Sequence, residues 1–388
     1  MQLGFFEMVG NGNCNGNMAY DIMINILKRL PVKSLFRFKC VSKDWFNLFN
    51  SPYFISLHLQ HSTLLLLFQR IPLSNLNHSQ SSSSSSSCLI GQDFKVHNPQ
   101  FIDFAVTDKV IGSCNGLLCV KHTNNNHMLS ISNPATREIR QVPEILHDIK
   151  SFYYFGFGFS PIANDYKVVR ISVPDEDRIL DLDDIRVSRA EVYSLTSGAW
   201  REIDATILQT LYLMSNSVTV NGVMFWQAFA TDPDAEFVVS FDISSEMFTL
   251  LKGPPSPPST LLTHSHTNVL AVHNNKLAMF HYFINGSFES SSIELWVLEA
   301  ERWVKQYSVG PFSRILYPLS IWGDEIVCRE ELHGRVDEYS KVETVLSLFN
   351  PYSNELKKLP AQRDKYYYVS FNYAESVVPV ANVHHEQE

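Results

Sequence analysis

The sequence lacks any long hydrophobic run. Its longest uninterrupted apolar stretch extends only from Leu64 to Phe68, whereas a membrane-spanning helix needs about 20 apolar residues. The first ten residues, MQLGFFEMVG, also lack the basic and apolar segments of a secretory signal. These absences predict neither membrane insertion nor export, and therefore a protein of the cytoplasm, the nucleus or both.

Cysteine and charged residues are also scarce. The six cysteines are scattered over 388 residues, and only Cys114 and Cys119 are close together, with no second ligand pair near them. This pattern predicts reduced, buried thiols, no metal site and no cofactor. A content of 45% hydrophobic and 18% charged residues is typical of a folded chain with a large core.

The charges are unevenly distributed along the chain. Residues 18–60 have a net charge of +4, whereas residues 61–388 have a net charge of −12. Nucleic-acid binding usually needs a basic surface, and the body of this chain has the opposite sign. The distribution therefore excludes general nucleic-acid binding by the body.

Changes in residue composition along the sequence divide the chain into three parts. Residues 1–17 are rich in Asn and Gly, which predicts a flexible leader, and residues 18–60 are helical in pattern. Residues 63–388 consist of short β-branched and aromatic runs separated by turn residues. Two polar inserts interrupt this third part: a serine tract at about residues 79–88, expected to be a disordered loop, and an acidic loop at residues 173–188.

The β-rich part contains a repeat of about 50 residues. Short turns such as Asn115-Gly116 precede apolar runs, which align on Leu117, Val168, Val223, Leu277 and Ile326 with spacings of 51, 55, 54 and 49. A sixth match pairs Asn372 with Val378, 52 residues further on. Between these runs lie five strand–turn–strand units: ISNPATREI, VYSLTSGAW, FDISSEMF, WVLEAERW and FNPYSNEL.

A period near 50 made of four short strands is typical of a kelch-like β-propeller blade. The alternative is an open stack of antiparallel sheets with a coincidental period. Six alignment points predict six blades, of which the last has only its first strands at the C-terminus, from Tyr366 to Val380. We expect its other strands from Thr63 to Arg70 or from Leu89 to His97, because such pairing closes the ring and removes exposed edges.

Residues 18–60 predict a small all-α module of three short helices. The first is expected to place Ile22, Ile26 and Leu27 on one face and to end at Leu30-Pro31. Pro31 suits the first turn of the second helix, where its missing N–H is not needed.

The third helix has a capping residue, Ser42, at its start. The module is also unusually rich in large aromatic side chains: Phe36, Phe38, Trp45, Phe46 and Phe49. They cannot all enter one very small core. A second apolar surface is therefore expected to be covered by a partner.

The stretch DIMINILKRLPVKSLFRFKCVSKDW resembles an F-box, the motif that anchors a substrate receptor to the Skp adaptor of a cullin–RING ubiquitin ligase. The resemblance covers Met18 to about His58. The body resembles the F-box-associated, kelch-like domain common in plants, because GSCNGLLCV, SNPATREIRQVP, GFGFSPIANDYKVVRI and VNGVMFW follow in that family's usual order. Together the two resemblances cover most of the chain.

The motif also implies which residues face the adaptor. By position they are Ile22, Ile26, Leu30, Pro31, Leu35, Val41, Ser42, Lys43 and Trp45. Trp45 is alternatively a core residue of the helical module. The first turn departs from the family pattern, because Met18, Ala19 and Tyr20 stand where a Leu-Pro or Ile-Pro pair is usual.

The resemblance implies a non-catalytic substrate-recognition subunit of an SCF-type (Skp–cullin–F-box) ubiquitin ligase. The F-box would hold the Skp adaptor and through it a cullin, and the propeller would hold an unidentified target protein. Propellers usually recognise partners through loops on one rim. The first candidates for target contact are therefore acidic residues of the 173–188 loop: Asp175, Glu176, Asp177, Asp181, Asp183 and Asp184.

Two other functions remain as alternatives. The basic head could be a helix-turn-helix-like nucleic-acid reader, although aromatic residues occupy most of its turns. The propeller could be an enzyme, although no Ser/His/Asp arrangement, phosphate loop or carboxylate pair can be placed at a meaningful spacing. Gly156-Phe-Gly158 begins a G-x-G pattern, but Pro161 stands where a dinucleotide-binding loop needs glycine, so a strand–turn feature is expected.

Overall fold

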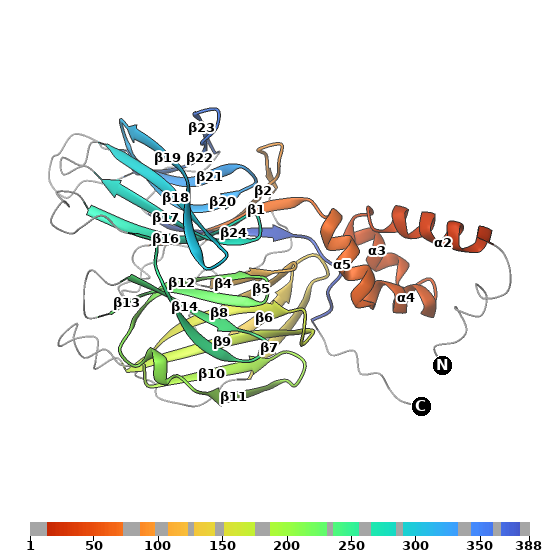
Figure 1. The fold of residues 1–388 in the computed structure, drawn as a ribbon. Coiled ribbons are helices and arrows are strands. Elements are labelled where there is room, and N and C mark those ends of the chain that lie inside the picture. Colours follow the sequence, from red (N-terminus) through yellow and green to blue (C-terminus); the bar gives the residue numbers. More distant parts are fainter. Residues whose placement is uncertain are drawn as a thin grey trace.

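The computed structural model describes residues 14–72, 86–97, 108–122, 128–143, 151–174, 187–230, 236–255, 265–284, 290–332, 343–359 and 366–380. These residues form a group of short helices at one end of a ring of β-sheets (Figure 1). The helices are α2 (Cys14–Leu27), α3 (Val32–Phe38), α4 (Lys43–Asn50) and α5 (Pro52–His61). None of the helices in these ranges is long and apolar enough to cross a membrane.

The prediction of three helices was wrong, because residues after Ser51 form a fourth. The Ser51 hydroxyl accepts a hydrogen bond from the Phe54 N–H (3.2 Å), and Pro52 occupies the first turn of α5. This Ser-Pro pair is an ordinary helix-start signal. The first helix also begins early, at Cys14, so the last four residues of the expected leader are helical, while residues 1–13 lie outside the described residues.

The expected cap of α4 is present. The Ser42 hydroxyl accepts a hydrogen bond from the Trp45 N–H at 3.2 Å, and Asp44 lies in the first turn, where its charge complements the helix dipole. Pro31 lies one residue before α3, in an extended conformation. The sequence therefore specifies both helix starts locally.

The sheets form six blades of four antiparallel strands each. Blade 1 contains β4 (Lys109–Cys114), β5 (Leu117–Lys121), β6 (Leu129–Asn133) and β7 (Glu138–Val142). Blade 2 contains β8 (Ser151–Ser160), β9 (Asp165–Pro174), β10 (Arg189–Ser194) and β11 (Ala199–Ile203). Blade 3 contains β12 (Tyr212–Val220), β13 (Val223–Phe229), β14 (Glu236–Asp242) and β15 (Met247–Lys252).

Blade 4 contains β16 (Ser265–His273), β17 (Lys276–Ile284), β18 (Ser291–Glu299) and β19 (Arg302–Phe312). Blade 5 contains β20 (Ile315–Trp322), β21 (Glu325–Leu332), β22 (Glu343–Asn350) and β23 (Glu355–Lys358). Blade 6 contains β24 (Tyr366–Ala374), β1 (Leu64–Pro72), β2 (Ser86–Ile90) and β3 (Val96–His97). The first strand of each blade lies beside the first strand of the next, from β4 round to β24, which confirms a six-bladed propeller.

The ring closes as expected, by pairing between the two ends of the chain. Strand β24 pairs with β1 from Leu64 opposite Ala374 to Pro72 opposite Tyr366. Both candidate segments are used, because residues 64–70 lie in β1 and residues 89–97 contribute to β2 and β3. The sixth alignment match was wrong: β24 is the first strand of its blade and ends at Ala374, before Val378, and the second strand comes from β1.

The turns at one end of the propeller follow from their residue types. We call this the helix end, because β24 ends and β1 begins there, next to α5. Asn115, Asn164, Asn221 and Asn274 adopt positive φ angles of 48–51°, which Asn tolerates better than most residues. The repeated turns after the third strands are fixed by side-chain acceptors such as Asp242, whose Oδ1 accepts the N–H groups of Ser244 and Ser245, both at 2.8 Å.

Contacts between blades make the ring rigid. The Trp200 indole N–H donates to the Pro143 carbonyl of the preceding blade, and that of Trp303 donates to the Lys252 carbonyl, both at 2.8 Å. Gly156 lies within β8, where an added Cβ would be 2.4 Å from the Trp226 ring. The G-x-G pattern therefore permits close approach of blades and is not a dinucleotide-binding loop.

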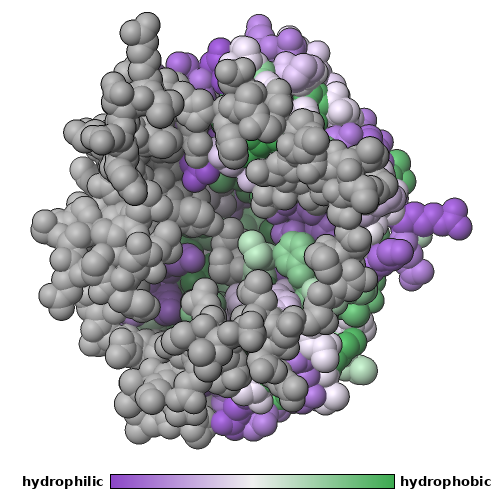
Figure 2. All heavy atoms as spheres, turned by 90° about the vertical axis from the view of Figure 1, so that its left-hand side faces the viewer, coloured by the Kyte–Doolittle hydropathy of each residue, from purple (hydrophilic) through white to green (hydrophobic). Residues whose placement is uncertain are grey.

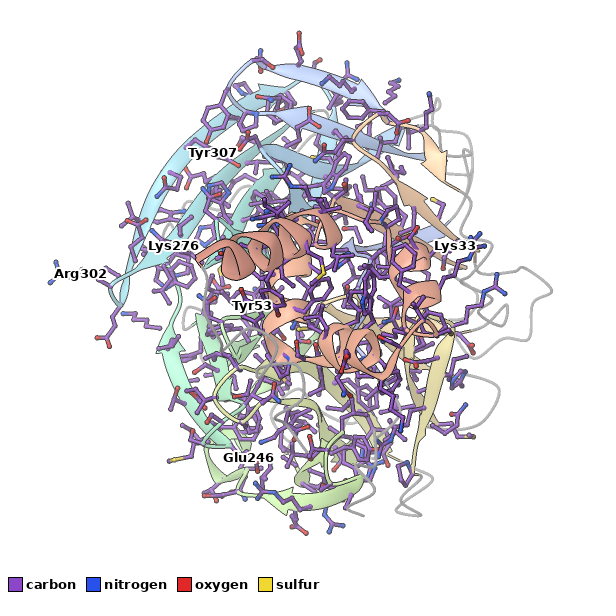
Figure 3. The ribbon with its side chains drawn as sticks, turned by 90° about the vertical axis from the view of Figure 1, so that its right-hand side faces the viewer. Lys33, Tyr53, Glu246, Lys276, Arg302 and Tyr307 are labelled. Atoms are coloured by element: carbon purple, nitrogen blue, oxygen red, sulfur yellow. The ribbon has the colours of Figure 1, made fainter. Side chains whose placement is uncertain are left out.

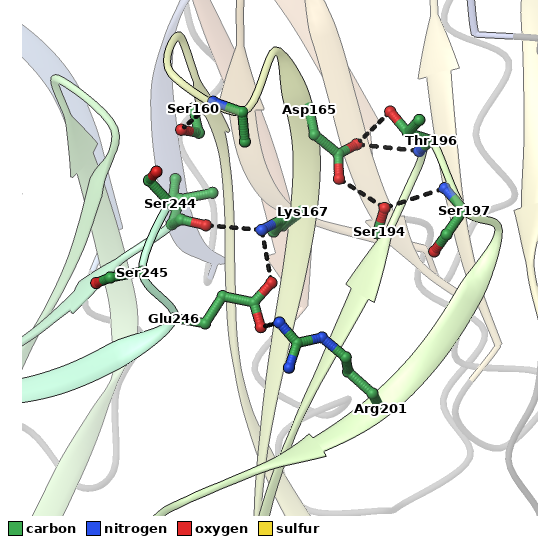
Figure 4. A network of polar contacts seen from close by, with 12 residues as sticks. Ser160, Asp165, Lys167, Ser194, Thr196, Ser197, Arg201, Ser244, Ser245 and Glu246 are labelled. Carbon is green, nitrogen blue, oxygen red and sulfur yellow. Dashed lines mark hydrogen bonds and ion pairs between the residues drawn. The ribbon is translucent and has the colours of Figure 1, made fainter.

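Blades 2 and 3 also share a polar network at the helix end (Figure 4). The Lys167 ammonium donates to the Ile243 carbonyl (2.8 Å) and to Glu246 (2.6 Å), and Glu246 also pairs with Arg201. Asp165 separately accepts hydrogen bonds from Ser194 and Thr196. Because every charge in this network has a partner, the arrangement stabilises the junction.

Candidate protein-docking surfaces

The four helices pack around a small aromatic and aliphatic core. Its buried members are Ile24, Leu27, Val32, Leu35, Phe49 and Phe54, together with Val377 from the far end of the chain. Trp45 contacts Phe38 and Phe49 edge to face, with ring centroids 5.4 and 5.5 Å apart. Trp45 is half-buried, so it contributes to this core and also reaches the surface.

Large apolar side chains remain exposed on the same helices. Ile22, Ile26 and Val41 are 53, 57 and 69% exposed. Phe36, Phe46 and Tyr53 are also exposed. Figure 3 looks onto this module, which lies over the middle of the propeller. We call Ile22, Ile26 and Val41 the apolar helix surface.

The structure divides the nine expected adaptor-facing residues into three groups. Ile22, Ile26, Pro31, Val41, Ser42 and Lys43 are exposed. Leu30 and Trp45 are half-buried against the core. Leu35 is fully buried and does not belong to the surface, because α3 turns it toward Phe49 and Phe54. The expected grouping of Leu27 with Ile22 and Ile26 was also wrong, since Leu27 faces the core.

The helices are attached to the propeller by residues 375–380, which we call the C-terminal segment. Val377 is fully buried in the helical core. The Ser62 hydroxyl donates to the Glu375 carbonyl at 3.1 Å, and the Asn133 side chain of blade 1 donates to the carbonyls of Ser376 and Val378, at 3.0 and 2.8 Å. The segment therefore lies between the two parts and contacts both.

Nothing in the sequence pattern indicated this attachment. Val377 and Val378 were assigned to a strand of the sixth repeat, whereas they follow the last strand. In the structure the two residues belong to different clusters, Val377 to the helical core and Val378 to the core between blades 1 and 2.

Blade 1 contains a Ser/His/Asp arrangement that the sequence did not predict. His122 Nδ1 lies 2.9 Å from Asp108 Oδ2, and His122 Nε2 lies 2.9 Å from Ser130 Oγ. Ser130 is only 3% exposed, in strand β6. Its hydroxyl is thus not presented to a substrate, and the three side chains join the ends of β4, β5 and β6.

A small cavity lies between blades 5 and 6, lined by residues that include Phe94, Trp322 and Asp324. Its volume is about 270 Å³, slightly below the range of roughly 300–1,000 Å³ that is usual for small-molecule sites. Lys357 already lies over the Phe94 ring, 4.8 Å from its centroid. One aromatic wall of the cavity is therefore already in contact with a cation of the chain itself.

The cysteines only partly follow the expectation of buried thiols. Cys119 and Cys328 are buried, but Cys40 is exposed. Burial raises the pKa of the Cys114 thiol to about 12, more than its hydrogen bond with the backbone at Phe159 lowers it. Cys114 is therefore protonated and unreactive at neutral pH. Within the described ranges, no group of His, Cys, Asp and Glu side chains could hold a metal ion.

The six acidic residues proposed for target contact, Asp175 to Asp184, lie outside the described residues. They join β9 to β10, whose facing ends lie away from the helices. We call this end of the propeller the opposite end. Figure 2 views it, and both hydrophilic and hydrophobic described residues reach the surface there.

The fold and surfaces define a class of protein: a propeller that carries a helical docking module. The F-box domain family matches residues 17–57, and the F-box associated beta propeller domain matches residues 63–363. The chain belongs to the family of F-box proteins with an F-box associated propeller.

Similar proteins are known from Arabidopsis thaliana. One F-box protein is 27% identical over 320 residues, covering 77% of this chain and 75% of the relative. An F-box/kelch-repeat protein is 25% identical over 289 residues, covering 72 and 71%. Among solved structures, oligogalacturonate lyase from Vibrio parahaemolyticus has a TM-score of 0.43 and 13% identity over 71% of each chain, which is too low to bear on function.

Proposed function

We propose that this protein is the substrate-recognition subunit of an SCF-type ubiquitin ligase. The F-box would bind a Skp-type adaptor and through it a cullin, while the propeller would hold the target protein. The observation that supports this proposal best is the apolar helix surface, because Ile22, Ile26 and Val41 are each more than half exposed. Large apolar side chains exposed on so small a module support coverage by a protein partner.

The chemistry of this surface favours a protein partner over nucleic acid. Phosphate contacts come mainly from Lys, Arg and hydrogen-bond donors, whereas the side chains at the centre of the apolar helix surface can offer none of these. The flanking Lys33 and Lys43 are exposed and would raise the association rate with an acidic adaptor more than the affinity.

In this role the protein is not itself an enzyme. It would bring the target's lysines close to a ubiquitin-charged enzyme supplied by other subunits, so that proximity provides the rate enhancement. We place this activity in the cytoplasm, the nucleus or both. The acidic residues from Asp175 to Asp184 remain the first candidates for contact with a basic target.

The adaptor interaction can be tested by co-purification of a Skp adaptor with the full chain. Ile22→Asp/Ile26→Asp should reduce adaptor binding about tenfold or more, because it places two charges at the centre of the contact. Ile162→Asp/Met247→Asp changes two exposed apolar residues of the propeller, 84 and 62% exposed, and should leave binding intact. Equal recovery of adaptor by all three proteins would refute the F-box role.

The structure also improves the choice of variant. Leu30→Ala would disturb the helical core, because the Leu30 side chain packs against it. Ile22 and Ile26 are free of this complication. The same full-length double variant should keep its target while losing the ligase, so proteins that co-purify with it and accumulate in cells are candidate targets.

A further inference from the structure

Two lysines lie directly opposite each other at the opposite end of blade 1. Lys109 is the first residue of β4, Lys121 is the last residue of β5, and the two are paired in the antiparallel register. Side chains opposite each other in such a pair point to the same side of the sheet, with Cβ atoms about 4.5–5.5 Å apart. Both lysines are half-buried, so two like charges on the same side of the sheet are partly withdrawn from water.

Both side chains point toward blade 2. Leu117 and Cys119 of β5 pack in the core between blades 1 and 2, and Lys121 follows Cys119 by two residues, on the same side of the strand. The Lys121 ammonium lies 5.6 Å from the centroid of the Phe155 ring in blade 2. Phe155 therefore forms an apolar floor beneath the Lys121 ammonium.

The Glu191 carboxylate of blade 2 already has partners of its own. Opposite Phe155 in blade 2 is Arg170, which lies over the rings of Tyr153 and Trp200. Its Nε donates to Glu191 at 3.0 Å, and Arg189 lies 3.6 Å from the other oxygen of the same carboxylate. Glu191 thus pairs with two arginines. Among the described residues, no carboxylate pairs with Lys109 or Lys121.

Among the described strand lysines, Lys109 and Lys121 combine partial burial with the lack of a carboxylate partner, whereas Lys252 and Lys358 are exposed. Lys167, Lys276, Lys305 and Lys357 each have a Glu oxygen within 3.1 Å. By contrast, burial lowers the pKa of both Lys109 and Lys121, and the charge of Lys121 lowers that of Lys109 further. Like charges placed directly opposite each other destabilise a sheet, so folding alone does not account for this pair.

We propose that Lys109 and Lys121 form an anion-binding site for an acidic side chain of the target protein, with the Phe155 ring as its floor. This inference rests on the proposed function and adds a class of target to it. A carboxylate or phosphate between the two ammonium groups would accept a charge-assisted hydrogen bond from each. The site lies at the end of the propeller away from the helices.

The test measures binding of a fluorescent tetraglutamate peptide to the full chain at low salt. Tetraglutamine and tetralysine peptides serve as controls, and a phosphoserine peptide and inorganic phosphate reveal whether the anion must be a carboxylate. Lys109→Gln/Lys121→Gln should weaken tetraglutamate binding by about tenfold per lysine. Lys276→Gln/Lys305→Gln removes the same charge from blade 4 and should leave binding unchanged.

Two outcomes of the peptide assay would overturn the proposal. One is equal affinity of the two double variants, which would mean that the peptide follows net charge only. The other is equal binding of tetraglutamate and tetraglutamine. Phosphate binding without peptide binding would also refute a protein target, since the site would then hold a free ion.

Stability provides a second, independent readout. A purely structural lysine pair would make Lys109→Gln/Lys121→Gln less stable, whereas a binding site predicts an unchanged or raised Tm, because the repulsion is removed. A lowered Tm would contradict the proposal. Adaptor binding by this variant should match the wild type, so failure of the anion site is distinguishable from failure of the F-box role.

The pKa values of the two lysines give the third readout, through NMR of isotopically methylated lysines. In the free chain they should lie below the ordinary value of about 10.4 and rise when the tetraglutamate peptide is added. An ordinary or raised pKa in the free chain would show that the protein's own carboxylates fill the site, and would refute the proposal.

Discussion

The two ends of the propeller differ in how their polar groups are matched. At the helix end, short turns are fixed by side-chain acceptors such as Asp165 and Asp242, and Lys167 has both a carbonyl and a carboxylate partner. At the opposite end, Lys109 faces Lys121 across β4 and β5. Near the opposite end the Arg170–Glu191 pair is matched, whereas Lys109 and Lys121 keep unfavourable charge, which we propose serves binding. The predictions below test this contrast.

The largest loss of stability is expected from a substitution at the junction between helices and propeller. Val377→Asp places a charge in the helical core, where Val377 is fully buried, and should destabilise the helices by more than about 3 kcal/mol. Adaptor binding should be lost together with the helical circular-dichroism signal. Tyr352→Asp, at a position that is 71% exposed, should change neither, and equal behaviour of the two variants would contradict the assigned junction.

A smaller effect is expected from the buried ion pair near the opposite end. Arg170 and Glu191 have side chains that are 5 and 6% exposed, so Glu191→Gln leaves a buried arginine without its counter-ion and should cost about 3 kcal/mol in denaturant unfolding. Glu202→Gln removes the partner of Arg189 in a pair that is 34 and 61% exposed, and should cost less than about 1 kcal/mol. Equal losses in the free energy of unfolding would mean that burial does not determine how much each ion pair contributes to stability.

Removing one turn acceptor should have a modest effect. Asp242→Ala leaves the N–H groups of Ser244 and Ser245 without their acceptor and should lower the free energy of unfolding by about 1 kcal/mol. Asp204, at the opposite end, accepts hydrogen bonds from the N–H and the hydroxyl of Thr206 and is exposed, so Asp204→Ala should cost less. Thermal unfolding of both variants tests whether the helix-end turns are the more important ones.

The smallest effect concerns pH. Burial lowers the pKa of His58, more than the Leu30 carbonyl raises it. The unfolded chain, with a histidine pKa near about 6.5, then binds more protons than the folded one. His58 stabilises the fold fully above that pH, and its contribution is lost as pH falls through it toward the folded pKa. The Tm of the wild type should therefore fall more between pH 7.5 and 5.5 than that of His58→Gln, while His61→Gln should stay closer to the wild type, because the charge of His61 lowers the pKa of His58 less than burial does.

The sequence predicted the propeller because each blade repeats the same local signals. Asn115, Asn164, Asn221 and Asn274 begin equivalent turns, and their spacing alone indicates one blade per 50 residues. The repeat failed where the chain closes the ring, because the second strand of blade 6 lies some 300 residues before the first. The residues around Val378 contain no sequence signal for the pairing of β24 with β1.

The helical surface was predictable only in part. Ile22 and Ile26 are one helical turn apart and both face outward, whereas Leu27 is rotated away from them and Leu35 is needed for the core. A motif match gives the positions of a contact region but does not separate side chains that touch the partner from those that support them. The lysine pair was not predictable, because its register is set by a bulge in β4.

The C-terminal segment makes folding of the helices depend on synthesis of the propeller. Val377 completes the core of helices that begin at Cys14, so the ribosome must make nearly the whole propeller before the F-box can finish folding. Until then, the helical core lacks one of its buried members. Only a chain synthesised through its last blade would therefore present a finished docking module to the adaptor.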